Sequence, residues 1–317
     1  MSTLIAKAIA PGATIGIVAP ASPYDQMSDV ERGVAWWESR NYKVKFAEGA
    51  LHRTNYVAGT PESRASDVMA TFADAEVDAI QCLRGGYGSA ETIPLIDFKV
   101  IADNPKPFIG FSDITALHTA IHRFTGLVTF YGPSLTSLAS MSTFTEQRML
   151  AMLGGETTGA FPSNPDDSYV QTLATGKASG RLIGGCLSDL MYTMGTPWEL
   201  DLDGAIFVFE EVGSSPHTID RALFQLAQAG KLKDVAGVVV GDLVACEWHD
   251  GGGSPWPHTK TLEEVLKDRL APLGIPVIYR LPFGHGDHLA TVPLGVQATV
   301  DAIDGSLVVT EPALHRA

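Results

Sequence analysis

The sequence predicts an α/β protein, with an N-terminal domain built on a parallel sheet and a C-terminal β-rich mixed domain. Short apolar strands alternate with amphipathic helices over residues 1–160, as in parallel βαβ units. Residues 154–176 are rich in Gly, Pro, Asp, Ser and Thr, a composition typical of linkers. Strands are more frequent and helices fewer over residues 175–317. We therefore expect two domains, covering 1–160 and 175–317.

The N-terminal domain contains four predicted parallel strands, at residues 14–20, 43–46, 78–83 and 107–111. Ser28–Glu31 has the pattern of a capping box and predicts the start of the first helix. Thr60-Pro61 predicts the start of the second helix, with proline at the first helical position. Because ligands of parallel sheets bind beyond the carboxyl ends of the strands, functional residues are expected there.

The C-terminal domain has a different succession of predicted strands and helices. Apolar strands are predicted at residues 205–209, 235–240 and 276–281, followed by short ones at 289–293, 296–301 and 306–310. Pro216 begins one helix, and a capping box at Thr261–Glu264 begins another. The aromatic side chains at helical spacing are expected in the core: Trp36, Trp37, Phe72 and Phe224.

The composition is that of a globular, acidic protein. Of 317 residues, 45% are hydrophobic and 18% are charged, and the net charge is −14. Such a field does not attract nucleic acid or anionic membranes, so neither is an expected partner. No apolar run approaches the ~20 residues of a membrane helix, and residues 1–10 lack the features of a signal peptide. The cysteines, Cys82, Cys186 and Cys246, are odd in number and widely spaced, which predicts a cytoplasmic protein without disulfides.

A strand that turns sharply into a helix ends at Ser112. Such a turn lifts the side chain clear of the sheet and directs free backbone N–H groups toward whatever the side chain attacks. The segment resembles a nucleophile elbow, although Ile114 replaces the second glycine of G-x-S-x-G. Serine is also a favoured helix N-cap, and a plain capping role remains open from this segment alone.

Two more polar side chains stand at the ends of apolar strands, Glu210 and His285. A serine nucleophile needs a base within hydrogen-bond reach, and that base needs an acceptor to orient it. Ser, His and a carboxylate supply these three roles in any chain order. The glycines of Arg84–Gly88 suit an oxyanion hole, because a residue without Cβ lets its N–H approach closely. A tight turn requiring positive φ explains the same glycines.

Other polar residues receive simpler interpretations. His285 and His288 form a short His-x-x-His, but no third ligand lies nearby in the sequence, so neither a metal nor another cofactor is expected. Asp242, His249 and Asp250 belong to a Gly-rich segment and are interpreted as surface residues.

These separate signals match one family pattern. The chain resembles the LD-carboxypeptidases, serine peptidases also called muramoyltetrapeptide carboxypeptidases. The resemblance runs from about residue 12 to about residue 300 and rests on the following segments, in order: Gly16–Ser22, Arg84–Gly88, Gly110–Thr115, Tyr131–Pro133, Gly180–Gly185, Gly195–Trp198, Phe209–Val212, Ile219–Arg221, Gly284–Gly286 and Leu294–Gly295.

The resemblance implies a catalytic triad and two backbone donors. Ser112 would be the nucleophile, His285 the general base and Glu210 its orienting partner. The N–H groups of Gly86 and Asp113 would form the oxyanion hole. The family's usual substrate is the cytoplasmic murein tetrapeptide, from which terminal D-Ala is released during cell-wall recycling, and its members are often homodimers.

The chain departs from the family pattern at two positions. Cys186 replaces the Asn of Gly-Gly-Asn, and Glu211 replaces the Asp of the usual Glu-Asp pair. A related branch hydrolyses peptidyl-nucleotide antibiotics such as microcin C, and this substrate class remains an alternative, as does a binding protein without chemistry. Arg84 and Arg221 are candidates for binding a substrate carboxylate. Ion pairs across the domain junction would explain both arginines equally well.

Overall fold

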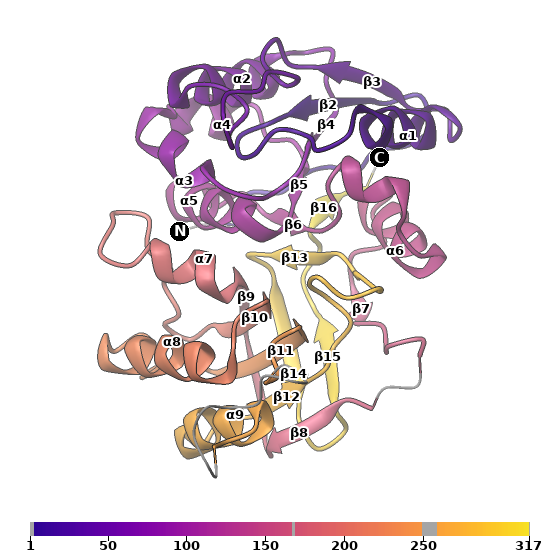
Figure 1. The fold of residues 1–317 in the computed structure, drawn as a ribbon. Helices are drawn as coiled ribbons and strands as arrows, with labels where there is room; N and C mark the ends of the chain where they lie inside the picture. The colour runs from indigo at the N-terminus through magenta and orange to yellow at the C-terminus, as the bar shows by residue number, and fades with distance from the viewer. Residues whose placement is uncertain (1–2, 167–168, 249–258, 317) are drawn as a thin grey trace.

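The computed structural model describes residues 3–166, 169–248 and 259–316, which form two layered halves (Figure 1). The upper half in the figure contains a six-stranded sheet, and the lower half contains an eight-stranded sheet. The predicted α/β class is confirmed, with parallel pairing dominant in the first sheet and mixed pairing in the second. No helix in the described ranges has the length and apolar character needed to cross a membrane.

The first sheet has the strand order β13-β6-β5-β4-β2-β3. Pairs among β2 to β6 are parallel, as expected when helices connect successive strands. β13 pairs antiparallel with β6, so the predicted strand near residues 289–293 joins the N-terminal sheet and not the C-terminal one. The strands are β2 (Thr14–Val18), β3 (Lys43–Phe46), β4 (Ala79–Cys82), β5 (Phe108–Gly110), β6 (Thr129–Tyr131) and β13 (Val292–Leu294).

Helices cover the first sheet. α2 begins at Pro61 with Thr60 as its N-cap, as predicted. α1 begins one residue before Ser28, and its N-cap is Gln26 without a side-chain hydrogen bond, so the predicted Ser28 capping box is wrong. The helices of this half are α1 (Met27–Glu38), α2 (Pro61–Ala73), α3 (Ser89–Thr92), α4 (Phe98–Asp103), α5 (Thr115–Thr125) and α6 (Thr143–Leu153), with 3₁₀ turns η1 (Ile93–Leu95), η2 (Ser112–Ile114) and η3 (Thr136–Ala139).

The second sheet has the order β7-β15-β14-β9-β10-β11-β12-β8, in which the central strands β9 to β12 are parallel and the outer pairs antiparallel. Its strands are β7 (Gly159–Ala160), β8 (Gln171–Ala174), β9 (Lys177–Cys186), β10 (Ile206–Val212), β11 (Gly237–Val244), β12 (Val277–Tyr279), β14 (Gln297–Asp301) and β15 (Ser306–Val309). The remaining elements are α7 (Leu187–Tyr192), α8 (Pro216–Gln228), α9 (Leu262–Leu270), η4 (Ala271–Leu273), and the small parallel pair β1 (Ala6–Lys7) and β16 (Leu314–His315).

Both faces of the second sheet are buried. Side chains of β10 alternate in direction, because successive residues of a strand point to opposite faces. Ile206 and Val208 belong to the apolar cluster that continues through the N-terminal half. Phe207 and Phe209 belong to a second cluster that includes the inner side chains of α8 and α9. Phe224 on α8 is 46% exposed, so its predicted place in the core is wrong.

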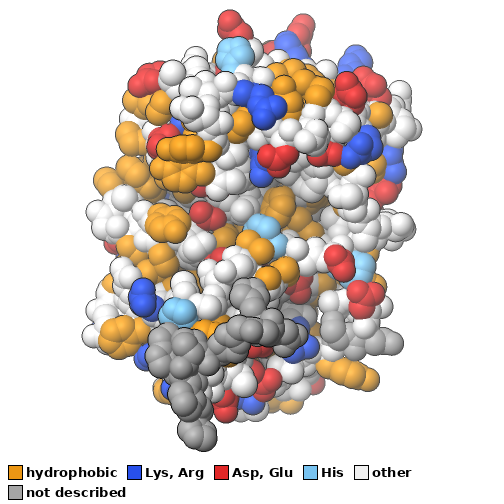
Figure 2. Space-filling view, viewed as in Figure 1, with side chains coloured by type: hydrophobic (Ala, Val, Ile, Leu, Met, Phe, Trp, Pro, Cys, Tyr) orange, Lys and Arg blue, Asp and Glu red, His pale blue; other side chains and the backbone are white. Residues whose placement is uncertain are grey.

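The carboxyl ends of several parallel strands face the junction of the two halves. β4 and β5 approach it from the first sheet, and β9 and β10 approach it from the second (Figure 1). The surface is hollowed along this junction, where histidine, acidic and hydrophobic side chains lie close together (Figure 2). The topology thus places the predicted strand-end residues around one depression.

Candidate active site

Ser112 occupies a strained turn between β5 and α5. Its φ is 62°, a left-handed conformation that costs a residue with a side chain about 1–2 kcal/mol. The N-cap of η2 is Phe111 and that of α5 is Ile114, so the alternative role of Ser112 as a helix cap is wrong. A Cβ on Gly85 would lie 2.8 Å from the Cβ of Ser112, so this glycine lets the Arg84–Gly88 turn approach the serine. Strain at a half-buried polar side chain is a feature of functional sites.

Glu210 and His285 form a direct pair. The Glu210 side chain is fully buried, and its Oε2 accepts hydrogen bonds from Nδ1 of His285 at 2.7 Å and from the His285 backbone N–H at 3.2 Å. A Cβ on Gly284 would lie 2.6 Å from the same oxygen, so glycine at this position lets the loop approach the carboxylate. The pair fixes both the ring orientation and the tautomer with the proton on Nδ1, leaving Nε2 free to act as a base.

Tyr131 connects the serine turn to this pair. Its hydroxyl donates to Oε1 of Glu210 at 2.6 Å and accepts the backbone N–H of Ser112 at 3.0 Å. Burial, and then the Glu210 charge, raise the pKa of Tyr131 well above its ordinary value, so the phenol remains a donor. No role was predicted for Tyr131 from the sequence. The available signal was its position at the end of a strand of the first sheet.

The three predicted residues are therefore gathered in one place. Tyr131 links Ser112 to Glu210, Glu210 binds His285, and the His285 ring lies 5.0 Å from the ring of Phe111, the residue before Ser112. They come from the turn after β5, from β10 and from the loop after β12. The serine turn, the histidine and the buried carboxylate therefore lie in one region of the junction.

The glycine turn lies beside Ser112. Gly86 is exposed with φ 107°, and an added Cβ would overlap the side chain of Ser22. The Ser22 side chain holds the Arg84–Gly88 turn in place, because its Oγ accepts the Tyr87 N–H at 3.1 Å. On the other side, the Asp113 carboxylate accepts the Ser89 N–H at 2.8 Å. These contacts fix the backbone of both predicted oxyanion donors, Gly86 and Asp113.

Further carboxyl groups surround the pair. Burial raises the pKa values of Asp189 and Asp242 to about 7, and that of Glu211 above its ordinary value. Asp242 lies in β11, half-buried, and an added Cβ on Gly286 would overlap its carboxylate, so the predicted surface position of Asp242 is wrong. His249 and Asp250 lie outside the described residues. The site is thus acidic on the C-terminal side.

His288 does not share a site with His285. Its Nδ1 bonds Ser142 at 2.9 Å and its Nε2 bonds Asp166 at 3.0 Å. Within the residues that the structure describes, no three His, Cys, Asp or Glu side chains are grouped closely enough to hold a metal ion.

The two candidate arginines lie in different surroundings. Arg84 forms an ion pair with Asp25, whose side chain is 75% exposed, and bonds the Pro23 carbonyl. Both partners belong to the N-terminal half, so this ion pair of Arg84 does not cross the junction. Arg221 is exposed on α8 and lines a small cavity that also contains Glu211.

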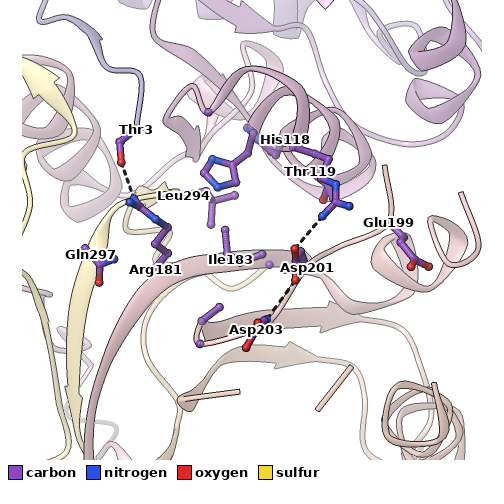
Figure 3. Close-up of a pocket in the computed structure, with 16 residues that line it drawn as sticks. Thr3, His118, Thr119, Arg181, Ile183, Glu199, Asp201, Asp203, Leu294 and Gln297 are labelled. Carbon is purple, nitrogen blue, oxygen red and sulfur yellow. Dashed lines mark hydrogen bonds and ion pairs between the residues drawn. The ribbon is translucent and has the colours of Figure 1, made fainter. Parts of the chain in front are cut away.

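A cavity of about 640 Å³ lies between α5 and the second sheet, away from the triad residues (Figure 3). His118 projects into it toward Leu294 and Ile183, and its Nε2 contacts the Gly110 carbonyl at 2.9 Å. Burial lowers the pKa of His118 to about 4, so this imidazole is neutral. At its rim, Arg123 pairs with Asp201 at 2.9 Å. We assign this cavity no part in the chemistry.

The pH dependence follows from the environment of His285. Burial acts to lower its pKa, but the hydrogen bond to Glu210 and the charges of Glu210, Glu211 and Asp189 outweigh burial, so the pKa lies above 6.5. A general base must be neutral, and His285 is protonated below its pKa. We therefore expect kcat/KM to fall as pH drops through a pKa above 6.5.

The control for this pH limb is Asp242→Asn, because Asp242 itself has a pKa of about 7. The acid limb should persist in that variant, and NMR titration of the His285 ring should give the same pKa. An acid limb at or below pH 6.5, or one that disappears in Asp242→Asn, would contradict the assignment.

Comparison with known proteins places this geometry in a family. The Peptidase S66 models, described as the LD-carboxypeptidase N-terminal and C-terminal domains, match residues 15–132 and 179–300. A Bacillus subtilis (strain 168) protein named probable murein peptide carboxypeptidase is 36% identical over 306 residues, covering 96% of this chain and 93% of its own.

Two solved structures share the whole fold. Muramoyltetrapeptide carboxypeptidase from Oxalobacter formigenes has a TM-score of 0.79 and 28% identity, covering 94% of this chain and all of its own. Microcin C7 self-immunity protein MccF in complex with aspartyl sulfamoyl adenosine has a TM-score of 0.86 and 27% identity, covering 98% of this chain and all of its own. The two domain models together match more than half of the residues. The chain therefore belongs to the LD-carboxypeptidase family.

Proposed function

We propose that the protein is a serine carboxypeptidase that hydrolyses an LD-peptide bond and releases terminal D-Ala from murein tetrapeptides in cell-wall recycling. The observation that carries this proposal is the chain of contacts from Ser112 through Tyr131 and Glu210 to His285. It supplies a nucleophile on a strained turn, a base and a buried acceptor that orients the base. The names of the relatives supply the substrate class.

The mechanism assigns one step to each group. Nε2 of His285 accepts the proton of the Ser112 hydroxyl as Oγ attacks the carbonyl carbon, while Glu210 stabilises the imidazolium. The N–H groups of Gly86 and Asp113 donate to the oxyanion. His285 then protonates the leaving amino group of D-Ala, and the carbonyl remains on Ser112 as an ester. Water, activated by His285, hydrolyses that ester and restores the serine.

Substrate binding requires a cation in an acidic site. Arg84 is our candidate for the terminal carboxylate, since its partner Asp25 is largely exposed and can be exchanged for a ligand. Arg221 is a second candidate for a substrate carboxylate. Contacts that are equal in the ground and transition states change KM more than kcat, which is the expected result of losing either arginine.

A peptidyl-nucleotide is the alternative substrate. The similarity to the solved complex of MccF with aspartyl sulfamoyl adenosine is the observation that favours it. In both cases the bond cleaved joins a carbonyl carbon to a nitrogen atom, so the same triad serves either substrate. The two substrates differ in their acyl and leaving groups, and a direct assay with each substrate distinguishes the two functions.

The test is incubation of the purified protein with a murein tetrapeptide and, separately, with a peptidyl-nucleotide, followed by mass spectrometry. We expect the tetrapeptide to lose one D-Ala and the peptidyl-nucleotide to remain largely intact. Cleavage of the nucleotide alone would replace the main proposal by the alternative. Binding of either compound without any product would indicate a binding protein.

We also propose that the protein acts in the cytoplasm as a homodimer. The three buried cysteines Cys82, Cys186 and Cys246 are free thiols, which suits a reducing compartment. Light scattering coupled to gel filtration measures the assembly directly. A mass near 33.7 kDa, that of one chain, would contradict the dimer.

A further inference from the structure

Arg64 is a buried cation that has no part in the proposed mechanism. It lies on α2, which contacts α3 in the half of the molecule that contains the first sheet (Figure 1). Its side chain is 1% exposed, whereas that of its ion-pair partner Glu91, on α3, is 40% exposed. Charged side chains are rarely buried to this degree unless their polar groups have partners. The partners of Arg64 therefore indicate what the buried charge does.

The guanidinium of Arg64 bonds three loops at once. Its Nη1 donates to the Pro20 carbonyl at 2.6 Å and to the Gly88 carbonyl at 2.7 Å. Its Nε donates to the Gly59 carbonyl at 3.2 Å. A single nitrogen thus ties the segment that follows β2 to the end of the Arg84–Gly88 turn. A planar fork of five N–H groups holds several acceptors in fixed directions, which the compact ammonium of lysine does not.

One consequence concerns the first proposed oxyanion donor, the Gly86 N–H. In the segment that follows β2, the Ser22 N–H donates to the Gly85 carbonyl at 3.2 Å, and the Ser22 Oγ accepts the Tyr87 N–H at 3.1 Å. The Gly85 carbonyl and the Gly86 N–H belong to one planar peptide unit, so the bond from Ser22 fixes the direction of the donor. Arg64 ties that segment to the end of the same turn.

A second consequence concerns the other proposed donor, the Asp113 N–H. The carbonyl of the peptide unit between Gly88 and Ser89 accepts the hydrogen bond from Arg64. The N–H of the same unit donates to the Asp113 carboxylate at 2.8 Å, and the Ser89 hydroxyl donates to the Asp113 backbone carbonyl. Hydrogen bonds in such a chain polarise and strengthen one another in a buried site. Arg64 therefore acts on the backbone of Asp113 through one peptide unit.

We propose that Arg64 is a positioning residue that holds both oxyanion donors, Gly86 and Asp113, at the spacing that the tetrahedral intermediate requires. This inference rests on the proposed function, whose mechanism uses the two donors. Donors that stabilise an oxyanion must be in place before the charge develops, and a misplacement of about 1 Å can cost about 10²-fold in rate. Arg64 contributes to catalysis through the backbone that it holds.

The experiment replaces Arg64 by lysine, which keeps the charge but cannot hold all of these carbonyls. With the murein tetrapeptide we expect kcat to fall by about 10- to 100-fold, less than the roughly 10²- to 10³-fold cost of removing a donor completely. KM should stay close to that of the wild type, because the oxyanion forms only after the substrate has bound. The acid limb of kcat/KM should not move, because it reports the protonation of His285.

A second substrate distinguishes failure of this inference from failure of the proposed function. p-Nitrophenyl acetate is a small ester whose hydrolysis uses the nucleophile and the oxyanion hole without recognition of a peptide. Its kcat in Arg64→Lys should fall by a factor similar to that for the tetrapeptide. If the wild type cleaves the ester but not the tetrapeptide, the proposed substrate is wrong and the ester still tests Arg64. If the wild type cleaves neither, the proposed function fails and this inference fails with it.

Ser89→Ala tests the same assignment from the other end of the peptide unit. It removes one buried hydroxyl that bonds the Asp113 carbonyl and leaves Arg64 in place. We expect kcat to fall and KM to stay near that of the wild type. The double variant with Arg64→Lys should lose less than the product of the two single losses, because both changes displace the same donor. A double variant that loses the full product would overturn the connection between Arg64 and Asp113.

Arg40→Lys is the matched control. Arg40 is a half-buried arginine of the same half that bonds the Trp36 carbonyl and the Glu146 carboxylate. Its replacement should lower the melting temperature and leave kcat and KM unchanged. The inference is overturned if folded Arg64→Lys keeps the wild-type kcat on both substrates, or if its loss lies in KM and not in kcat. Thermal unfolding measures the folded fraction, and if Arg64→Lys does not fold, a wild-type kcat in Ser89→Ala overturns the inference.

Discussion

Replacing Ser112 by alanine should lower kcat for D-Ala release by roughly 10⁴- to 10⁶-fold, the loss found when a serine hydrolase loses its nucleophile. The hydroxyl is the only group removed, so substrate binding should change little. The rate is measured by mass spectrometry with the same tetrapeptide at saturating concentration. Turnover within tenfold of the wild type would show that Ser112 is not the nucleophile.

The strained backbone provides a control for folding. Alanine at φ 62° retains the strain, whereas glycine adopts this conformation without cost. Ser112→Gly should therefore be as inactive as Ser112→Ala but more stable than it by about 1 kcal/mol. Thermal unfolding of both variants measures the difference. Equal loss of activity in two variants that differ in stability would separate chemistry from folding.

Much of the site could be predicted because polar side chains interrupt an apolar pattern. Ser112 and Glu210 each follow apolar residues of a strand, and parallel strands end at a common edge. His285 follows the strand β12 by a short loop. The positive φ of Ser112 could not be predicted from the sequence, because serine rarely adopts such a φ. Gly85 lies against Ser112 and permits a close approach of the two turns, but it does not indicate the φ of the serine.

Tyr131 was missed because no strand was predicted at residues 129–131, so its place at the end of a strand was not recognised. Its hydroxyl partners lie 19 and 79 positions away along the chain, so no local spacing signals them. Asp242 was misplaced for a related reason, since the glycines that follow it in the sequence suggested a loop whereas β11 continues through Val244. In both cases, contacts with residues far apart in the sequence determine the environment of the side chain.

The errors in the fold have local causes. A helix can start at Met27 without a side-chain cap, so the Ser28 pattern was not needed, whereas Thr261 and Glu264 do form the predicted capping box. Phe224 is covered on one side by Arg269, whose guanidinium lies 5.0 Å from the ring, and this contact replaces burial in the core. Hydrophobic periodicity alone does not distinguish a phenylalanine buried in the core from one covered by an arginine at the surface.

Replacing Glu210 by glutamine should lower kcat by about 10⁴-fold, because the amide cannot satisfy both of its neighbours. With its NH₂ toward Nδ1 of His285, it would force the proton onto Nε2 and remove the base. With the amide oxygen toward His285, the amide NH₂ would face the Tyr131 hydroxyl. That hydroxyl already accepts the Ser112 N–H, and its own proton would then have no acceptor.

Tyr131→Phe is the matched comparison, since it removes one hydrogen bond to Glu210 and leaves the carboxylate charged. Its effect on kcat should be smaller than that of Glu210→Gln, and the acid limb of kcat/KM should move to higher pH. The upward shift is expected because a carboxylate that has lost a donor interacts more strongly with the imidazolium of His285. A Glu210→Gln enzyme as active as Tyr131→Phe, with an unshifted pH profile in both, would mean that the buried carboxylate does not orient the base.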